Sequence, residues 1–442
     1  MGAALLAKAK GLNPFVSDLE SIRNDRKDDL TKNEIHFEEG GHSEEIILVA
    51  DLIIKSPGIP ESASIIQKAR DRKIEIIDEL EFAYRHTKAT MIAITGTNGK
   101  TTTTLLTYHL LKSAGINVGL AGNVGFSLAR QVIEDNFDYY VVEVSSFQLD
   151  GMYDFKAHIA ILLNITPDHL DRYNDSFEEY AASKLRITQN QQADDKLIYW
   201  NDDPSIINEL AERSINSKKL AISINDELGS GAFLSAKDLI FKSDTEFTVE
   251  ANVLPLIGKH NLVNSMASIL AVDSIGLRLD QILSGLRSFE NAPHRLEKVA
   301  AIHEVDYIND SKATNVNAVY FALDGVDSKI IWVAGGIDKG NDYRLIEQLV
   351  REKVKALICL GIKNEPLTSF FEGKIPVIHE TQDIAEAVKT AQDLANNGDT
   401  VLLSPACASF DLFDNYEQRG NRFREEVIKL KSQNGHRREV AI

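Results

Sequence analysis

The sequence predicts an α/β fold with mostly parallel sheets, divided into three domains. Apolar, strand-like runs alternate with helix-like runs along almost the whole chain, which is the pattern of parallel sheets covered by helices. Some runs, such as residues 159–163, are apolar at every position, as in strands buried on both faces. Near residue 96 one run ends in a Gly-rich turn that leads directly into a helix-compatible segment, the order of a nucleotide-binding α/β domain.

Polar stretches divide the chain. Residues 84–88 and 291–293 separate three segments, so we predict an N-terminal domain at 1–88, a central domain at 89–293 and a C-terminal domain at 294–442. A chain of 442 residues is long enough for three domains of this size. The predicted strands lie at residues 46–54, 91–95, 139–144, 158–164, 197–200, 330–334, 356–360 and 400–404.

Composition narrows the function classes. A formal charge of −18 argues against a nucleic-acid-binding surface. No apolar run approaches the roughly 18–20 residues of a membrane span. Two cysteines, Cys359 and Cys407, cannot form a disulfide framework, which fits a reducing compartment. We therefore expect a cytoplasmic protein with no membrane span. A monomer is a separate expectation that does not follow from composition.

The first segment begins unusually. Residues 2–10 predict a helix ended by Gly11, and residues 15–18 predict a strand. In a doubly wound domain a strand and a Gly-rich turn precede such a helix, and here neither does. We expect a Rossmann-like domain truncated at its first strand, with weakened binding of the ligand that this domain holds.

The central segment opens with a predicted phosphate-binding loop, the sequence Gly-Thr-Asn-Gly-Lys-Thr at 96–101. Glycines let the backbone approach phosphate oxygens, and the following helix N-terminus adds partial positive charge. Lys100 can bridge terminal phosphates and Thr101 can ligate Mg²⁺. The general P-loop pattern requires Gly at position 94, where this chain has Ile94. An ordinary strand–turn–helix junction is the alternative, and Lys-Thr directly after the turn favours nucleotide binding.

Polar residues follow other predicted strands of this segment. Glu143 ends the strand at 139–144, at the sheet edge where ligands sit, although a lone Glu is more often solvated. His169 follows the strand at 158–164 and could ligate a metal, with Asp168 and Asp171 to orient it. The same stretch also predicts a short helix with Thr166 and Pro167 as its N-cap and first residue. Lys184, on an amphipathic helix at 177–187, would by itself be an ordinary surface lysine.

The third segment carries three polar clusters at strand ends or turns, residues 309–315, 335–340 and 404–411. Lys312 and Lys339 could bind a carboxylate or a phosphate. The Gly335-Gly336 pair fits a strand-to-loop turn, and a dinucleotide fingerprint is excluded because G-x-G-x-x-G is absent. Around the start of this segment, Asn side chains at 261 and 264 could contact a base and Arg295 could stack on one.

Together these motifs resemble the Mur ligase family, three-domain enzymes that form amide bonds with ATP. The shared stretches are residues 96–101, 143–149, 164–169, 258–264, 294–295 and 309–315. The most specific is Ser-Pro-Ala-Cys-Ala-Ser-Phe-Asp at 404–411 with Asn-Tyr-Glu-Gln-Arg-Gly at 415–420, which resembles the D-glutamate-adding members. Residues 56–60 and 78–81 also match. The fold implied is a Rossmann-like N-terminal domain, a central ATPase domain and a Rossmann-like C-terminal domain.

The resemblance implies roles residue by residue. The ATP site would comprise Gly96, Thr97, Asn98, Gly99, Lys100, Thr101 and Thr102 at the phosphates, with Asn264, Arg295 and Asp310 at adenine and ribose. Two Mg²⁺ ions would be held by Thr101 and Glu143, and by His169 and a carbamylated Lys184. Lys100, Glu143, His169 and Lys184 would be the catalytic set. The substrate UDP-N-acetylmuramoyl-L-alanine would contact Ser56, Pro57, Gly58, Asn123 and His169, and D-glutamate would contact Lys312, Thr314, Lys339, Ser409, Phe410 and Tyr416.

The reaction implied is the ligation of D-glutamate to UDP-N-acetylmuramoyl-L-alanine through an acyl phosphate, a step of peptidoglycan precursor synthesis. Tyr416 stands where the family usually has Phe, which keeps the ring and adds a hydroxyl. One alternative is a ligase like folylpolyglutamate synthase, which shares the short phosphate loop. Another is a nucleotide-dependent switch protein, which would need no amino-acid site.

Overall fold

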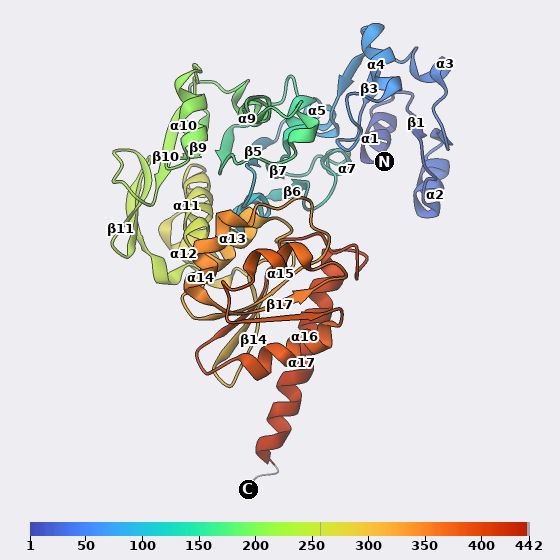
Figure 1. Cartoon of the computed structure of the whole chain (residues 1–442). Helices are drawn as coiled ribbons and strands as arrows, with labels where there is room; N and C mark the ends of the chain where they lie inside the picture. The colour runs from blue at the N-terminus through green and yellow to red at the C-terminus, as the bar shows by residue number, and fades with distance from the viewer. Residues whose placement is uncertain (257, 440–442) are drawn as a thin grey trace. The chain divides into compact units, whose positions relative to one another are not determined.

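The computed structural model describes residues 1–256 and 258–439 and is an α/β protein (Figure 1). It divides into two compact units. Unit 1 comprises Met1–Leu254 and Val263–Phe289, and unit 2 comprises Pro255–Leu262 and Glu290–Ile442. The three domain boundaries stay a prediction, because this division has two parts.

The start of unit 1 contains two separate two-stranded parallel sheets, β1-β2 and β3-β4. Its elements are α1 (Gly2–Ala9), β1 (Phe15–Asp18), α2 (Asn24–Lys32), β2 (His36–Glu39), α3 (Glu44–Ile47), β3 (Leu52–Ile54), α4 (Ser64–Asp71), β4 (Glu75–Ile77) and α5 (Glu79–Tyr84). The helix ended by Gly11 and the strand at 15–18 are as predicted. The single strand predicted at 46–54 is wrong, because Ser43 and the two glutamates after it begin the helical turn α3, and only β3 is extended.

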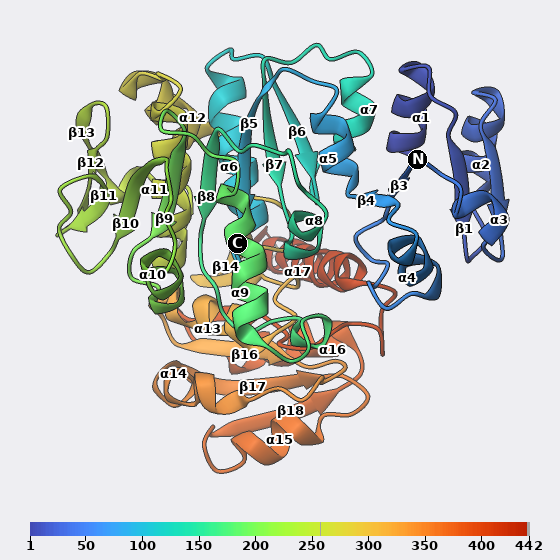
Figure 2. The same cartoon turned by 90° about the horizontal axis from the view of Figure 1, so that it is seen from above.

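A nine-stranded sheet forms the rest of unit 1, in the order β13-β12-β11-β10-β9-β8-β5-β7-β6. All neighbours from β6 to β11 pair in parallel, and β12 and β13 add an antiparallel edge. The strands are β5 (Thr90–Thr95), β6 (Val118–Gly122), β7 (Tyr139–Glu143), β8 (Ile159–Leu162), β9 (Lys196–Trp200), β10 (Lys218–Ser223), β11 (Gly231–Ser235), β12 (Asp238–Lys242) and β13 (Glu246–Glu250). Figure 2 shows β5 in the middle of this sheet.

Helices cover this sheet. The helical elements are α6 (Lys100–Ser113), α7 (Leu128–Val132), α8 (Ser146–Asp150), η1 (Leu170–Arg172), α9 (Phe177–Leu185), η2 (Arg186–Thr188), α10 (Pro204–Ala211), η3 (Ala251–Val253), α11 (Lys259–Asp273) and α12 (Leu279–Ser288). One core packs α5, α7, α8 and α9 against buried residues of β5, β7 and β8. The runs apolar at every position are indeed buried on both faces, as β8 shows.

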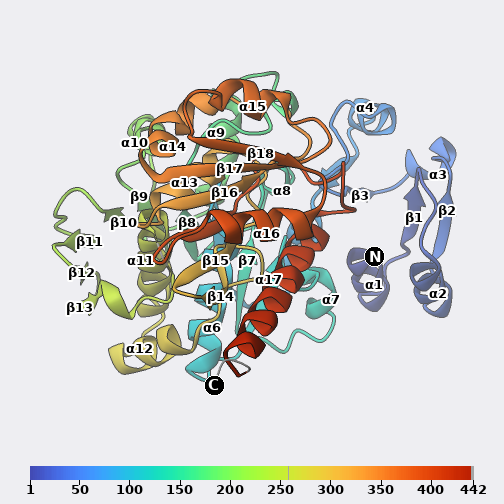
Figure 3. The same cartoon turned by 60° about the horizontal axis from the view of Figure 1, so that its bottom comes forward.

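Unit 2 contains a six-stranded sheet in the order β14-β15-β19-β16-β17-β18, with only β14 antiparallel to its neighbour. Its elements are β14 (Glu297–Ile302), β15 (Val305–Asn309), α13 (Val316–Asp324), β16 (Ile330–Ala334), η4 (Tyr343–Ile346), α14 (Glu347–Lys353), β17 (Val354–Leu360), α15 (Glu365–Phe371), β18 (Val377–Thr381), α16 (Ile384–Leu394), β19 (Thr400–Leu403) and α17 (Tyr416–Glu439). Helices α13, α14 and α15 pack on one face, and α16 and α17 pack on the other (Figure 3).

Candidate functional site

The predicted phosphate loop joins β5 to α6, at the carboxyl end of the central parallel strand. Because β7 and β8 flank β5, the segments that follow all three strands meet at this edge. Gly96 and Gly99 have φ angles of 153° and 84°, which L side chains rarely adopt. A Cβ on Gly96 would lie 3.0 Å from the Leu163 Cβ, so the backbone packs too closely for a larger residue.

Asn164, which follows β8, fixes the conformation of this loop. Its side-chain oxygen accepts a hydrogen bond of 2.8 Å from the Asn98 N–H, and its side-chain nitrogen donates one of 3.0 Å to the Asn98 carbonyl. Its own carbonyl accepts from the Thr97 N–H at 2.9 Å. The Thr97 hydroxyl in turn donates to the Thr166 carbonyl and lies 3.1 Å from the Tyr180 hydroxyl. These neutral hydrogen bonds therefore hold the loop in place.

Two lysines converge on one carbonyl oxygen of the loop. The Lys100 amine donates to the Gly96 carbonyl at 2.8 Å and to the Thr97 carbonyl at 2.9 Å. The Lys184 amine donates to the same Gly96 oxygen at 3.0 Å and lies 4.6 Å from the centre of the Tyr180 ring. Lys184 is only 2% exposed, so the expectation of an ordinary surface lysine is wrong. Burial, followed by the nearby charge of Lys100, holds the pKa of Lys184 well below its ordinary value.

Glu143 ends β7 directly beside the loop strand, in register with Ile94 of β5. Its side chain is 5% exposed, and its Oε2 atom has no hydrogen-bond partner in the described ranges. A buried carboxylate oxygen without a partner is costly unless a cation meets it. The site therefore fits a divalent cation at this oxygen; Thr101, the other residue predicted to hold that ion, lies in the first turn of α6. Groups of three or more His, Cys, Asp or Glu with metal-binding geometry do not occur among the described residues.

His169 lies in the loop between β8 and η1, with a φ of 53°. Its Nε2 atom is 3.7 Å from an Asp168 carboxylate oxygen, and its ring centre is 5.3 Å from that of Phe147 on α8. The predicted helix start at Thr166 and Pro167 is wrong, because the helical turn η1 begins at Leu170 and Thr166 hydrogen-bonds to Thr97 instead. In the described part of the chain no hydrogen bond or ion pair joins His169 to Glu143 or Lys184.

The remaining predicted residues of unit 1 lie around this edge. Asn264 on α11 is buried against the loop, since a Cβ on Gly99 would lie 2.5 Å from its side-chain oxygen. Asn123 follows β6, is exposed, and donates its N–H to the Glu143 carbonyl at 3.1 Å. Pro57 and Gly58, in the exposed turn after β3, accept hydrogen bonds from Arg172 at 3.2 and 3.3 Å.

The predicted residues of unit 2 gather where β15, β16 and β19 end. Asp310 accepts hydrogen bonds from the Ser404 hydroxyl at 2.9 Å and from the Leu296 N–H at 3.2 Å. Burial raises the pKa of Asp310 to about 7. The Lys312 amine lies 3.7 Å from the centre of the Tyr416 ring, a cation–π contact. Thr314 donates its N–H to the Lys312 carbonyl at 2.9 Å.

The other residues predicted near D-glutamate lie on two adjoining loops. The Ile337 N–H donates to the Ala408 carbonyl at 2.8 Å, which joins the loop of Lys339 to the loop of Ser409. Lys339 is exposed, Ser409 is buried, and the Phe410 ring is 67% exposed. A ring so exposed at a loop tip is available to a ligand.

Sequence reasoning gave no role to Arg419, which is 1% exposed and organises all three loops. Its guanidinium donates to the Ser311 carbonyl and hydroxyl at 3.0 Å each, to the Cys407 carbonyl at 3.2 Å and to the Gly335 carbonyl at 3.3 Å. Burial lowers its pKa to about 10. Asn164 was likewise missed. Both are side chains that bind backbone carbonyls or amides across distant segments, and the sequence alone carries no signal for that.

Comparison with known proteins identifies the family. The chain matches the Mur ligase middle domain at residues 94–272, the Mur ligase glutamate ligase domain at 294–407 and the MurD N-terminal domain at 4–65. It is 53% identical over 433 residues to the UDP-N-acetylmuramoylalanine–D-glutamate ligase of Porphyromonas gingivalis, which covers 97% of this chain and 96% of that protein. The chain belongs to the Mur ligase family.

Further members of the Mur ligase family are similar to this chain in sequence or in fold. The UDP-N-acetylmuramoylalanine–D-glutamate ligase of Bacteroides fragilis is 50% identical over 430 residues, covering 97% of each chain. Among solved structures, a pseudomurein peptide ligase type C from Methanothermus fervidus has a TM-score of 0.61 at 22% identity, covering 97% of each chain. The UDP-N-acetylmuramate-alanine ligase MurC from Thermotoga maritima has a TM-score of 0.59 at 19% identity, covering 97% of this chain and 96% of that chain. These structures show a shared fold.

A membrane span is not found among the described helices of this Mur ligase: none combines the length and the apolar character that crossing would require.

Proposed function

We propose that this Mur ligase joins D-glutamate to UDP-N-acetylmuramoyl-L-alanine in an ATP-dependent reaction that proceeds through an acyl phosphate. The relatives with 50–53% identity over nearly the whole chain bear the name of that enzyme. The observation that carries the proposal is the glycine loop at 96–99 next to Lys100, the unpartnered carboxylate oxygen of Glu143 and the buried amine of Lys184. A cytoplasmic monomer remains the prediction from the sequence.

The loop is suited to hold the phosphates of ATP. Its backbone N–H groups and the first turn of α6, from Lys100 to Thr102, form the positive end of a helix. Lys100, which now binds two loop carbonyls, would turn to the terminal phosphates when ATP enters. Asn264 beside Gly99, and Arg295 with Asp310 in unit 2, are the residues we assign to adenine and ribose.

The buried, unpartnered carboxylate oxygen of Glu143 fits Mg²⁺. Glu143 and Thr101 would hold one ion, and His169 with Lys184 would help to hold a second. When bound, Mg²⁺ neutralises negative charge on the transferring phosphoryl group. For Lys184 to contribute, its neutral nitrogen must attack the carbon of CO₂, so that an N–C bond forms, a proton leaves to solvent and a carbamate anion results. The lowered pKa of Lys184 supports this step because it favours the neutral amine.

The chemistry then follows two steps. The alanine carboxylate of the substrate, bound by Ser56, Pro57, Gly58, Asn123 and His169, attacks the γ-phosphorus of ATP and ADP leaves. The amine of D-glutamate next attacks the acyl carbon, so that a C–N bond forms, the C–O bond to phosphate breaks, phosphate leaves and the nitrogen loses a proton to solvent. We assign Lys312 and Lys339 to the carboxylates of D-glutamate, and Thr314, Ser409, Phe410 and Tyr416 to its surroundings.

The experiment is phosphate release from ATP with UDP-N-acetylmuramoyl-L-alanine and one amino acid. We expect release with D-glutamate and only background release with L-glutamate or without amino acid. Release that requires a folate and L-glutamate would support the folylpolyglutamate synthase alternative. Release that requires neither acceptor would support a nucleotide-dependent switch. Either of these outcomes would contradict the proposal.

A further inference from the structure

Arg172 connects two segments that are far apart in the sequence of unit 1. It ends the turn η1, three residues after His169, and its guanidinium donates to the Pro57 carbonyl at 3.2 Å and to the Gly58 carbonyl at 3.3 Å. Those two carbonyls belong to the exposed turn after β3, more than a hundred residues earlier. The planar guanidinium therefore binds the carbonyl oxygens of two successive residues in that turn.

The same guanidinium also contacts an aromatic cluster. Its central carbon lies 4.7 Å from the centre of the Phe147 ring. Phe147 contacts the His169 ring at 5.3 Å and is stacked on Tyr173, with ring centres 5.9 Å apart. The position of Arg172 is thus set by the aromatic group that also sets the position of His169.

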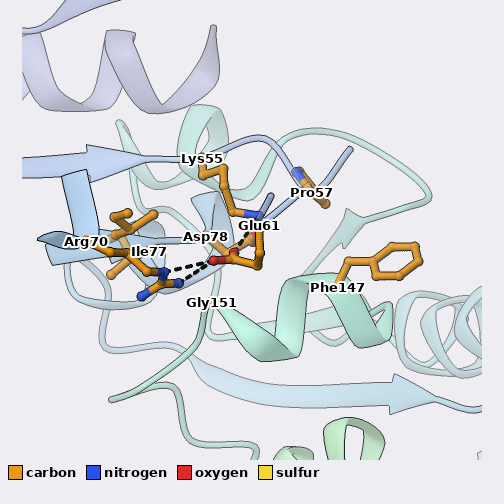
Figure 4. A pocket seen from close by; sticks show the side chains of 9 residues that line it. Lys55, Pro57, Glu61, Arg70, Ile77, Asp78, Phe147 and Gly151 are labelled. Atoms are coloured by element: carbon orange, nitrogen blue, oxygen red, sulfur yellow. Dashed lines mark hydrogen bonds and ion pairs between the residues drawn. The ribbon is translucent and has the colours of Figure 1, made fainter. Parts of the chain in front are cut away.

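A network of ion pairs contacts the same turn at Ile59. The Lys55 amine donates to the Ile59 carbonyl at 2.9 Å and lies 3.1 Å from a Glu61 carboxylate oxygen. Arg70 pairs with the other oxygen of Glu61 at 2.7 Å. Figure 4 shows this ion-pair network at one side of the pocket and Phe147 on α8 at the other, with Pro57 labelled between them in the chain's turn. Among the described residues, Arg172 is the only one whose side chain donates to the carbonyls of Pro57 and Gly58.

We infer that Arg172 is a positioning residue that fixes the Pro57–Gly58 turn relative to His169, and thereby sets the affinity for the sugar-nucleotide substrate. The inference rests on the proposed function, in which this turn and His169 both contact that substrate. Both hydrogen bonds of Arg172 go to protein carbonyls and its ring contact is to Phe147, so the role that we infer for it is to position the turn.

The kinetic test compares Arg172→Ala and Arg172→Lys with a matched control, Arg213→Ala. Arg213 is another arginine of unit 1, paired with Glu209 one helical turn away and distant from the turn in sequence. For both Arg172 variants we expect the KM for UDP-N-acetylmuramoyl-L-alanine to rise about 10-fold, which is the size expected for two exposed hydrogen bonds and one cation–π contact. The kcat and the KM for ATP should stay within about 2-fold, as a loss of uniform binding predicts.

The lysine variant separates geometry from charge. Lysine keeps the positive charge and loses the planar fork that reaches both carbonyls. If Arg172→Lys restores the wild-type KM, charge alone attracts the anionic substrate and the inference is wrong. Phe147→Leu should raise the same KM, and the double variant should be no worse than the larger single effect, because the two residues act as one unit. Multiplicative effects would contradict the inference.

A measurement without substrate keeps the inference separate from the proposed function. Hydrogen exchange of peptides covering residues 52–66 should be faster in Arg172→Ala than in Arg213→Ala or wild type. Faster exchange with no D-glutamate-dependent turnover in wild type would uphold the role of Arg172 in the turn while the proposed function fails. Unchanged exchange, together with active wild-type enzyme, would overturn the inference and leave the proposed function intact.

Discussion

The buried amine of Lys184 donates a hydrogen bond of 3.0 Å to the Gly96 carbonyl, the first residue of the phosphate loop. This contact places a nitrogen with a lowered pKa beside the loop that we propose binds the phosphates of ATP. A buried polar group that is kept for a reaction often lowers the stability of the fold. Removing such a group is then expected to raise stability and to abolish activity.

Lys184→Met should therefore be more stable and inactive. The pKa of Lys184 is lower in the folded than in the unfolded protein, so the unfolded state binds more protons between those two values and stability rises with pH across that window. In CO₂-free buffer at pH 7 we expect methionine to add about 1–2 kcal/mol to the free energy of unfolding. The gain should vanish near the unfolded pKa of about 10.4. Urea unfolding at both pH values checks this, and a destabilised, active variant would contradict it.

Glu143→Gln tests the unpartnered carboxylate. The change removes a buried charge and keeps the shape, so stability should be unchanged or slightly higher. Activity should fall by about 100-fold or more, and the Mg²⁺ concentration for half-maximal activity should rise, because a neutral amide is a poorer ligand than a carboxylate. Glu134→Gln, at an exposed position, is the control and should match wild type. An unaltered Mg²⁺ dependence in the Glu143 variant would contradict the assignment.

Gly99→Ala and Gly115→Ala form a matched pair at the two ends of α6. Their φ angles are 84° and 81°, so alanine strains both backbones by about 1 kcal/mol. Only at Gly99 would the new Cβ meet another atom, the Asn264 side-chain oxygen at 2.5 Å. We expect Gly115→Ala to lose stability alone, and Gly99→Ala also to raise the KM for ATP by about 10-fold or more. Equal ATP kinetics in the two variants would show that the contact is irrelevant.

Arg419→Met should separate the amino-acid site from the ATP site. Methionine leaves the carbonyls of Ser311, Gly335 and Cys407 without their buried donor, which should cost about 3–5 kcal/mol of stability. In the fraction that folds, the KM for D-glutamate should rise far more than the KM for ATP. Arg422→Ala is the control, because Arg422 lies on the same helix and is exposed. An unchanged KM for D-glutamate would refute the role in organising the loops.

Asp78→Asn should change how stability depends on pH. Burial raises the pKa of Asp78 to about 7, above its unfolded value, so the folded state binds more protons between about pH 4 and 7 and stability falls as pH rises through that window. Asparagine has no such titration and can still accept the Leu80 N–H at the start of α5. We expect the variant to gain about 1–2 kcal/mol at pH 8 and nothing at pH 4. A gain that is equal at both values would contradict this assignment.

Much of the fold follows from local sequence signals. Strands β5, β7, β16 and β19 begin and end within a residue of the predicted bounds, because runs buried on both faces differ sharply from their flanks. The turn at residues 44–47 was missed because the apolar residues 46–49 look like a strand when exposure is unknown, and Ile46 and Val49 are in fact exposed. The residues 166–167 were misjudged because Thr166 bonds to Thr97, which lies far away in the sequence.

Some residues of the candidate site could likewise be predicted from the sequence, and others could not. The glycines, Lys100 and Glu143 could be found from their places after strands, because the carboxyl ends of parallel strands share one edge. Burial of Lys184 could not be foreseen, since its partner is a carbonyl oxygen of a loop 88 residues away. Arg419 is similar: apart from the Ser311 hydroxyl, its buried acceptors are backbone oxygens, which every residue possesses, so nothing in the sequence marks them.

The central claim is that the loop at 96–101 presents the γ-phosphate of ATP to a substrate carboxylate. The most direct test uses UDP-N-acetylmuramoyl-L-alanine labelled with ¹⁸O in its alanine carboxylate, with ATP and D-glutamate, and measures the mass of the released phosphate. An acyl-phosphate route predicts that one labelled oxygen passes to each phosphate formed. Unlabelled phosphate released in step with amide formation would contradict the account.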